Sequence, residues 1–251
     1  HPAAPLVVEI PMVAVDGGRV LYTGDFNPHG TVTAGRAEPR PCETLIIEAT
    51  YGRPEQVLPP RDRVLRDLQG WMLAVCANGG GIVGAYTLGK AQEVVAAANA
   101  AGLRPMVSDE VGEVCDIYVQ YNVPLEYDRW GALTPEQRTA PGLLVTSSTA
   151  TSGRRPDEVV LELRRRGFQT ARVSGWCAFA PWALRGVDAG FPMSDHADFT
   201  GLIDFVEACA PQQVYTVHGA QSELAHEIQK RLDIQACSLP ERGETKLEEF
   251  T

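Results

Sequence analysis

The sequence has no excess of positive charge. Its 251 residues include 22 lysines and arginines against 32 aspartates and glutamates, which gives a formal net charge of −10. Proteins that coat nucleic acid through a general electrostatic field are usually basic, so this balance argues against that class. A nuclease stays compatible with it, because metal-binding carboxylates add negative charge that bound cations offset. Of the two main basic runs, Arg154-Arg155 and Arg164 to Arg166, we expect the second to end a helix, where cations suit the helix dipole.

Long apolar runs and closely spaced cysteines are also missing. No apolar run approaches the roughly 20 residues of a membrane span, and no basic stretch followed by an apolar core opens the chain as in a signal peptide. We therefore expect a cytoplasmic protein without a membrane partner. None of the six cysteines belongs to a CxxC pair, which disfavours a zinc ribbon and a thioredoxin-type motif. We expect reduced thiols, most of them buried.

Apolar periodicity indicates three stretches of structure. The first holds a hairpin between residues 7 and 23, turning at Asp16-Gly17-Gly18, and a strand at 44–48. In the second, from about residue 59 to 174, helices and strands alternate, which predicts a parallel sheet covered by helices. The helices are expected between Pro59-Pro60 and Gly79 and at 89–101, 110–121 and 156–166, and the strands at 82–86, 104–108, 143–146 and 169–174. The third has short strands and helices, expected at 187–191, 199–208, 214–217 and 221–231.

Four polar residues stand at the ends of predicted strands. Asp25, Glu48, His196 and His218 each follow a short apolar run, the position where folds with buried sheets usually place reactive groups. Carboxylates and imidazoles together suit zinc or another divalent cation. Taken singly, each also fits a structural role such as capping a turn, and Asp198 fits the N-cap of the next helix. The occurrence of all four in one chain favours a metal-dependent site.

Two further segments could contact phosphate groups. Residues 84–91 nearly match the phosphate-binding loop GxxxxGK[ST], but Ala91 stands where a hydroxyl would hold Mg²⁺, so we do not expect an NTPase. The helix start beside Lys90 suits a phosphate of another ligand, and an ordinary strand-to-helix turn explains it equally well. The hydroxyl-rich residues 146–153, with Ser147 and Ser148, fit either a phosphate-binding loop or a plain polar loop. Lys90, Ser147 and Ser148 are our substrate-binding candidates.

Five short segments follow one another in a recognisable order: LYTGDF at 21–26, EATYG at 48–52, LGKAQE at 88–93, SDHADF at 194–199 and VHG at 217–219. Along essentially the whole chain they resemble metallo-β-lactamase-fold nucleases of the β-CASP group. The first is similar to that group's fourth metal-binding motif, and the second, fourth and fifth are similar to its motifs A, B and C. The third is similar to a helix start in its inserted domain. The likeness is to the prokaryotic branch of ligase-associated DNA exonucleases and messenger-RNA 3′-end processing factors.

This resemblance implies a two-metal phosphodiesterase that cleaves DNA or RNA as an exonuclease. Two divalent ions, zinc or alternatively manganese, would activate a water for in-line attack. By motif match, Asp25 would bridge the metals and His218 would bind one of them. His196, held by Glu48, would act near the leaving group as a general acid. The expected partner is the nucleic acid substrate, and a homodimer is compatible with the sequence.

One part of the family pattern is missing from these 251 residues. The family carries an HxHxDH motif, which supplies four metal ligands, well before the GDF strand. The five histidines are His1, His29, His196, His218 and His226, and no HxHxDH occurs among them. His1 lies near the place of the family's third motif, so we include it as a metal-ligand candidate.

Three hypotheses follow from that departure. The chain is part of an active nuclease, or it is a catalytically inactive β-CASP relative that serves as a nucleic-acid-binding or scaffold subunit. The third, a metallo-hydrolase acting on a small substrate, is disfavoured by Glu48, His196 and the large insert between motifs A and B. No residue decides between DNA and RNA, and none fixes the polarity of an exonuclease.

The predicted architecture is α/β. Residues 1–52 and 187–251 would form a metallo-β-lactamase αββα sandwich lacking its N-terminal part, and residues 53–186 would form a β-CASP α/β insert of mainly parallel sheet. We expect Asp25, Glu48, His196 and His218 to converge on one site in the cleft between these domains.

Overall fold

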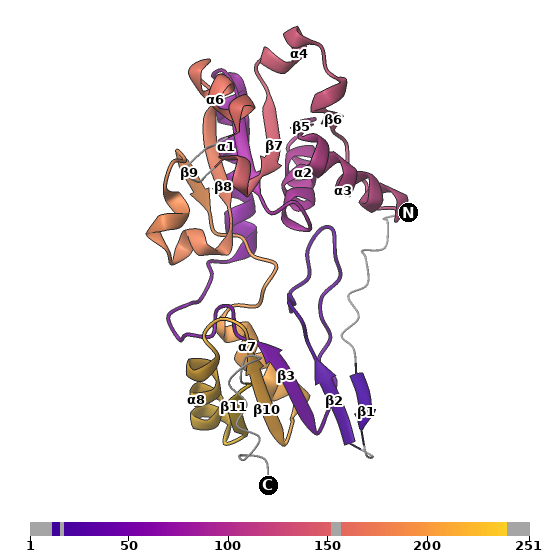
Figure 1. Cartoon of the computed structure of the whole chain (residues 1–251), viewed down its shortest axis with the longest axis vertical. Helices are drawn as coiled ribbons and strands as arrows, with labels where there is room; N and C mark the ends of the chain where they lie inside the picture. The colour runs from indigo at the N-terminus through magenta and orange to yellow at the C-terminus, as the bar shows by residue number, and fades with distance from the viewer. Residues whose placement is uncertain (1–11, 16–17, 152–156, 240–251) are drawn as a thin grey trace. The chain divides into compact units, whose positions relative to one another are not determined.

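The computed structural model describes residues 12–15, 18–151 and 157–239. The chain divides into two compact units (Figure 1). Unit 1 contains residues 31–35 and 58–195, and unit 2 contains residues 12–30, 36–57 and 196–239 within the described ranges. The domain boundaries expected from the sequence stay a prediction.

Unit 1 is built on a parallel sheet. Its described strands are β4 (Gly81–Ala85), β5 (Met106–Val107), β6 (Asp128–Arg129), β7 (Leu143–Ser147), β8 (Gln169–Val173) and β9 (Ala189–Phe191). They lie in the order β6-β5-β7-β4-β8-β9, and every neighbouring pair runs parallel. The central strands β4 and β7 are buried along their whole length, as expected of strands covered on both faces.

Helices cover both faces of this sheet. The apolar sides of α1 (Arg61–Ala77), α2 (Lys90–Ala100) and α3 (Asp109–Gln120) share one core cluster with the strands. The helix α6 (Glu158–Arg165) packs in a separate cluster containing Ile82 and Leu144, and the short α5 (Ser148–Thr151) lies against β4, β7 and β8. The expectation that Arg164 to Arg166 end a helix is confirmed, because α6 stops there.

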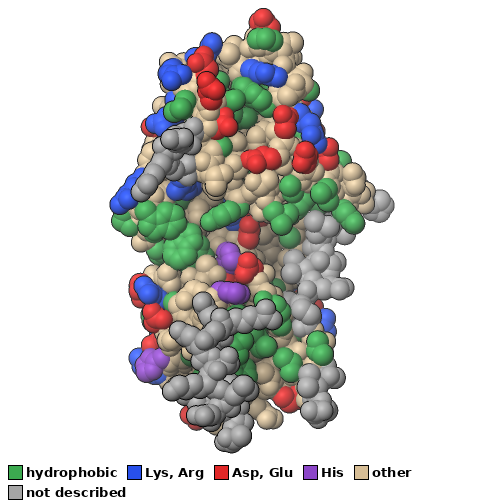
Figure 2. Space-filling view, viewed as in Figure 1, with side chains coloured by type: hydrophobic (Ala, Val, Ile, Leu, Met, Phe, Trp, Pro, Cys, Tyr) green, Lys and Arg blue, Asp and Glu red, His purple; other side chains and the backbone are tan. Residues whose placement is uncertain are grey.

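Short elements complete unit 1. They are η1 (Trp130–Ala132), α4 (Pro135–Thr139), η2 (Gly175–Ala178) and η3 (Pro181–Leu184). Figure 2 shows apolar side chains over the η2 and η3 segment, where Trp182 and Leu184 are exposed. On the same face basic and acidic side chains are interspersed.

Unit 2 holds a sheet of mixed direction. Its described strands are β1 (Met12–Val15), β2 (Gly18–Tyr22), β3 (Thr44–Glu48), β10 (Gln213–Val217) and β11 (Gln235–Ser238). They lie in the order β1-β2-β3-β10-β11, and only β1 and β2 pair antiparallel. Helices α7 (Phe199–Cys209) and α8 (Gln221–Leu232) share one apolar cluster with β2, β3 and β10. The N-cap role expected for Asp198 is confirmed, since its side chain accepts a hydrogen bond from the Gly201 N–H at 2.9 Å.

The α/β class with mainly parallel sheets is therefore confirmed, and several details differ from expectation. The strand expected at 104–108 shortens to two residues, and the sequence pattern revealed neither β6 nor β11. Residues 148–151 form a helix where a loop was expected. All six cysteines are free thiols, but only Cys42, Cys115 and Cys209 are buried. Among the described residues, no helix combines the length and the apolar character needed to cross a membrane.

Candidate functional site

Three of the predicted site residues meet at one edge of the unit 2 sheet. Strands β2 and β3 are parallel neighbours, so their carboxyl ends lie together. Asp25 follows β2 after a turn at Gly24, whose positive φ of 54° suits glycine, and Glu48 is the last residue of β3. The His196 segment reaches the same edge because the Ala197 N–H donates to the Phe26 carbonyl at 2.7 Å. One ligand atom from each of the three residues lies within 4.8 Å of the others.

Glu48 is fully buried and uses both of its carboxylate oxygens. Oε1 accepts the backbone N–H of Phe26 at 3.0 Å, and Oε2 lies 2.8 Å from Nδ1 of His196. A buried carboxylate needs such partners, since desolvating an unpaired charge is costly. Both oxygens therefore have hydrogen-bond partners, one of them on the His196 ring.

The ring of His196 is held from further sides. The Thr50 hydroxyl lies 3.3 Å from the same Nδ1 atom, and the Tyr51 ring stands edge-on at a centroid distance of 6.2 Å. An ionised carboxylate can only accept hydrogen bonds, so we assign the hydrogen on the imidazole to Nδ1. Nε2 is then the nitrogen through which the ring would act on a substrate. Thr50, Tyr51 and the Phe26 N–H are site features that the sequence analysis did not identify.

Asp25 and His218 are placed differently from that pair. The Asp25 side chain is 69% exposed, and its Oδ1 lies 3.9 Å from His196 Nδ1. His218 follows β10, is exposed and has a positive φ of 58°. The residues on either side of it pack against the segment that follows Glu48, because the Ala49 N–H donates to the Val217 carbonyl at 2.8 Å and a Cβ on Gly219 would overlap Ala49. His218 nevertheless lies outside the three-residue group, so the expected convergence of four side chains is seen for three.

These donors fit a divalent cation in kind but not in number. A carboxylate and an imidazole are normal zinc ligands, and a zinc site takes three or four of them from the protein. Of the three residues that the structure brings together, Glu48 already accepts two hydrogen bonds, and His218 lies outside the group. The third candidate, His1, lies outside the described residues. The described part of the chain therefore provides only a portion of a metal site.

Lys90 in unit 1 is not an open phosphate ligand. Its side chain is only 2% exposed, and its Nζ lies 2.6 Å from Oδ1 of Asp195, the residue directly before His196 in the sequence. Burial lowers the pKa of the Lys90 ammonium, opposed by the charge of Asp195. Beside this pair, Arg61 bonds Glu93 and donates to the Ser194 carbonyl at 2.9 Å.

The two serine candidates also lie in regular structure. Ser147 is the last residue of β7 and is buried, with its Oγ 3.0 Å from the Thr149 hydroxyl. Ser148 begins α5. The open hydroxyl-rich loop expected from the sequence is therefore wrong for residues 146–151, and residues 152–156 lie outside the described ranges.

The sheet of unit 1 nevertheless has a natural ligand position near these residues. After β4 the chain enters α2 on one face, and after the adjacent β7 it enters α5 and α6 on the other. Open α/β sheets bind ligands beyond the carboxyl ends of two strands whose connections diverge in this way. The loop after β4 exposes Tyr86, at 56%, and Leu88. The sequence could not show this position, because it depends on the order of strands in the sheet.

A family model describes part of the chain. Residues 190–236, which contain His196, His218, α7, β10 and α8, match a Zn-dependent metallo-hydrolase RNA specificity domain. The segment begins in the last residues of unit 1, at 190–195, and continues into unit 2 from His196 onward.

Three curated proteins are similar in sequence. A probable DNA ligase of Opitutus terrae is 30% identical over 252 residues, which cover 98% of this chain and 24% of that protein. An RNase J-like protein of Methanocaldococcus jannaschii is 36% identical over 84 residues, covering 32% of this chain and 20% of its own. Transcription termination factor FttA of Methanothermobacter thermautotrophicus is 35% identical over 80 residues, which cover 30% of this chain and 12% of that protein. The matched part of this chain thus spans a quarter or less of each relative.

The fold also occurs among solved structures. A protein of unknown function from Enterococcus faecalis superposes with a TM-score of 0.58 at 13% identity, covering 93% of this chain and 59% of the other. At that identity the likeness concerns the fold alone.

Proposed function

This chain belongs to the β-CASP group of metallo-β-lactamase-fold proteins, and on that premise we propose that it is a metal-dependent phosphodiesterase that hydrolyses DNA or RNA as an exonuclease in the cytoplasm. The observation that carries the proposal is the pairing of buried Glu48 with His196 beside the exposed Asp25. The similarity to an RNase J-like protein and to an RNA specificity domain supports a nucleic acid as the substrate.

The paired side chains suit proton transfer. Glu48 fixes the ring through Nδ1, so Nε2 is the atom that exchanges a proton with the substrate. A carboxylate behind an imidazole stabilises the positive charge that the ring carries when Nε2 is protonated. From that state His196 donates the proton to the leaving oxygen of the cleaved phosphodiester, and the oxygen departs as a neutral hydroxyl. Asp25, at 3.9 Å from the ring, stands on the exposed side of the pair.

A complete site would hold two divalent ions, zinc or manganese. Asp25 and His218 would be ligands within the described residues, and His1 is a further candidate outside them. The chemistry that such ions supply when bound is activation of water and stabilisation of charge on the phosphate. We also propose that the unit 2 sheet, with α7 and α8 on it, is half of an αββα sandwich.

The carboxyl ends of β4 and β7 are the proposed place for the nucleic acid strand in unit 1. Ser147, Ser148 and the exposed Tyr86 lie at these ends. Tyr86 offers a stacking face to a base. Lys90 contributes through its pair with Asp195 and the positive end of α2, rather than through an exposed ammonium.

The test is digestion of end-labelled DNA and RNA oligonucleotides with Zn²⁺ or Mn²⁺ added. The wild-type chain should shorten at least one of the two from an end, and His196→Ala should lose this activity. His226→Ala is the matched control, since His226 is exposed on α8 away from the Glu48 pair. Equal cleavage by wild type and His196→Ala would exclude the proposed role of His196.

A second candidate function is a catalytically inactive subunit that binds nucleic acid or acts as a scaffold. It is favoured by the small number of metal ligands among the described residues. Intact mass spectrometry together with metal analysis separates the two. Stoichiometric zinc or manganese and metal-dependent cleavage would eliminate the inactive subunit, whereas oligonucleotide binding without metal or cleavage would support it.

A further inference from the structure

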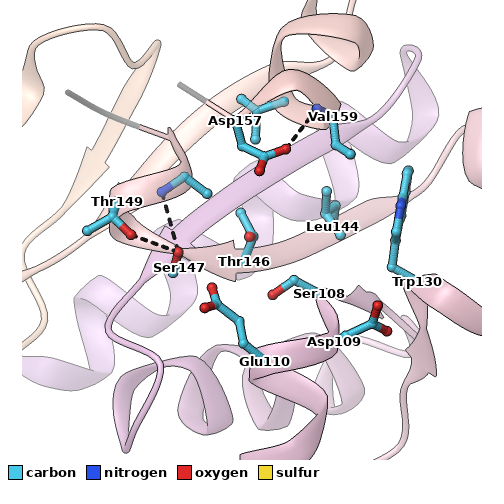
Figure 3. A pocket seen from close by; sticks show the side chains of 12 residues that line it. Ser108, Asp109, Glu110, Trp130, Leu144, Thr146, Ser147, Thr149, Asp157 and Val159 are labelled. Carbon is cyan, nitrogen blue, oxygen red and sulfur yellow. Dashed lines mark hydrogen bonds between the residues drawn. The ribbon is translucent and has the colours of Figure 1, made fainter. Parts of the chain in front are cut away.

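Unit 1 contains a pocket that the proposed catalytic chemistry does not use. It has a volume of about 470 Å³ and lies at the carboxyl ends of β5 and β7, between the starts of α3 and α6. Figure 3 shows Trp130 at one side and the side chains of Ser108 and Glu110 turned toward the middle. The size falls in the range of small-molecule sites, roughly 300–1,000 Å³.

Trp130 gives this pocket an aromatic wall. The residue also lines a neighbouring pocket together with Arg138, whose guanidinium carbon lies 5.4 Å from the centre of the Trp130 ring. The indole therefore lines both pockets, and Arg138 lies on the side of the second. A flat group entering the first pocket meets the indole, in the way that bases stack on aromatic side chains in single-strand binding sites.

The polar groups around the wall are mostly acceptors, and two of them have no hydrogen-bond or ion-pair partner among the described residues. Asp109 accepts the Gly131 N–H at 3.0 Å, and Asp157 accepts the Val159 N–H at 2.8 Å. Glu110, by contrast, makes no hydrogen bond or ion pair with another described residue. The Ser108 Oγ is shielded from solvent, has no hydrogen-bond partner in the described part of the chain and does not cap α3. Buried polar atoms are usually paired, so this hydroxyl has an unused capacity for a hydrogen bond.

The charge of the pocket decides which part of a nucleic acid it takes. Asp109, Glu110 and Asp157 put three carboxylates around it, and these repel a phosphate. A base is neutral, and guanine carries two adjacent donors, the ring N1–H and the exocyclic amino group. A single carboxylate can accept both.

We propose that this pocket binds one nucleobase of the nucleic acid, with a preference for guanine, stacked on Trp130 and hydrogen-bonded to Glu110. This inference rests on the proposed function for the presence of a strand, and the sugar-phosphate backbone stays outside the acidic rim. The pocket selects the sequence of a bound strand without taking part in cleavage.

The test measures nucleoside binding to the full chain in metal-free buffer containing EDTA, so that it does not depend on catalysis. The probes are 2′-deoxyguanosine and 2′-deoxyinosine, which differ by the amino group. Binding is followed through the indole N–H signal of Trp130 in ¹⁵N-correlated NMR spectra, assigned with Trp130→Phe, and by calorimetry.

We expect deoxyguanosine to bind about 10-fold more tightly than deoxyinosine, because one additional hydrogen bond to a charged group changes the affinity by roughly this factor. Glu110→Gln should remove this difference, because an amide offers one acceptor where the carboxylate offers two. Trp130→Ala should weaken both nucleosides about 10-fold. Glu113→Gln, one turn further along α3 and outside the pocket lining, is the charge-matched control and should change neither.

Equal affinity for the two nucleosides, or no shift of the Trp130 signal at millimolar nucleoside, would overturn the proposal. An equal response to spermidine would do the same, since it would show only attraction of cations to the acidic rim. Guanosine selectivity in a chain that cleaves nothing would leave the pocket standing and count against the nuclease. Cleavage without nucleoside binding would support the nuclease and overturn the proposal for the pocket.

Discussion

Glu48→Gln is the substitution that tests the candidate site most sharply. The carboxylate accepts two hydrogen bonds, from the Phe26 N–H at 3.0 Å and from His196 Nδ1 at 2.8 Å, and it is fully buried. A glutamine of the same shape has one oxygen and one NH₂ group. If the oxygen keeps the Phe26 N–H, the NH₂ group faces Nδ1, and that nitrogen must become an acceptor. The ring hydrogen then moves to Nε2.

The stability of the fold should change little. A hydrogen bond to a charged group contributes about 1.5–3 kcal/mol, but a buried carboxylate also carries a desolvation cost of several kcal/mol. The two effects oppose each other, so we expect Glu48→Gln to lower the free energy of unfolding by about 1 kcal/mol. Activity should fall by about 10³ to 10⁴-fold, the order found when the carboxylate behind a catalytic histidine of a protease becomes an amide.

Two measurements check this reasoning. Long-range ¹H–¹⁵N NMR spectra of the histidine rings report which nitrogen carries the hydrogen, and urea unfolding reports stability. Glu43→Gln is the control, because that carboxylate is exposed and bonded to Arg19 instead. If Glu48→Gln kept the hydrogen on Nδ1 of His196 together with full activity, the assigned role of Glu48 would be refuted.

Three further predictions follow from the packing of buried side chains and from charge. Lys90→Met should remove a pH dependence of the free energy of unfolding. Burial lowers the Lys90 pKa below its ordinary 10.5, so the stability of the wild type relative to the variant should rise with pH between that lowered pKa and 10.5. Urea unfolding at several pH values measures this rise. Gly84→Ala should lower the free energy of unfolding by about 2–3 kcal/mol, because the new Cβ would overlap Thr151 Oγ1 and lie 2.9 Å from Thr151 Cβ. The Glu43 carboxyl should titrate near pH 2 by ¹³C NMR, because hydrogen bonds from Arg19 lower its pKa to about 2. The stabilising effect of these hydrogen bonds is full above pH 4.5 and is lost as the pH falls through 2. Arg19→Gln should move the titration toward 4.5.

Each of these outcomes has a matched comparison. Lys230→Met removes an exposed ammonium and should leave the slope with pH unchanged; an identical slope in Lys90→Met would contradict the burial argument. In Gly142→Ala the nearest neighbour of the new Cβ would be the Met106 methyl at 3.5 Å. This substitution should lower the free energy of unfolding by much less than Gly84→Ala. A wild-type titration of Glu43 near pH 4.5 would contradict the paired geometry.

The sequence was sufficient for the elements with strong periodic or capping signals. The bounds of α1, α2, α3 and α7 follow from apolar spacing and flanking Gly, Pro and Asp residues, and they agree with the structure to within about two residues. Strand β6 was missed and the length of β5 was overestimated, because two residues are too few for a period-2 pattern. The edge strand β11 follows α8 without a recognisable turn signal.

The site was only partly open to sequence reasoning. The polar residues at strand ends could be picked out, since each interrupts an apolar run, and the fold brings three of them together. The burial of Lys90 depends on Asp195, more than a hundred residues later, so no local pattern reveals it. The pairing of Glu48 with the Phe26 N–H likewise needs the register of β2 against β3.

The most direct measurement of the central claim uses oligonucleotides in which a bridging oxygen of the cleaved phosphodiester is replaced by sulfur. A thiolate leaves without receiving a proton, so a general acid is no longer needed. With the sulfur on the leaving side, cleavage by His196→Ala should recover to within about 10-fold of wild type, while Asp25→Ala should stay inactive. If the sulfur substrate rescued neither variant or both equally, His196 would not be the proton donor and the account of the site would be wrong.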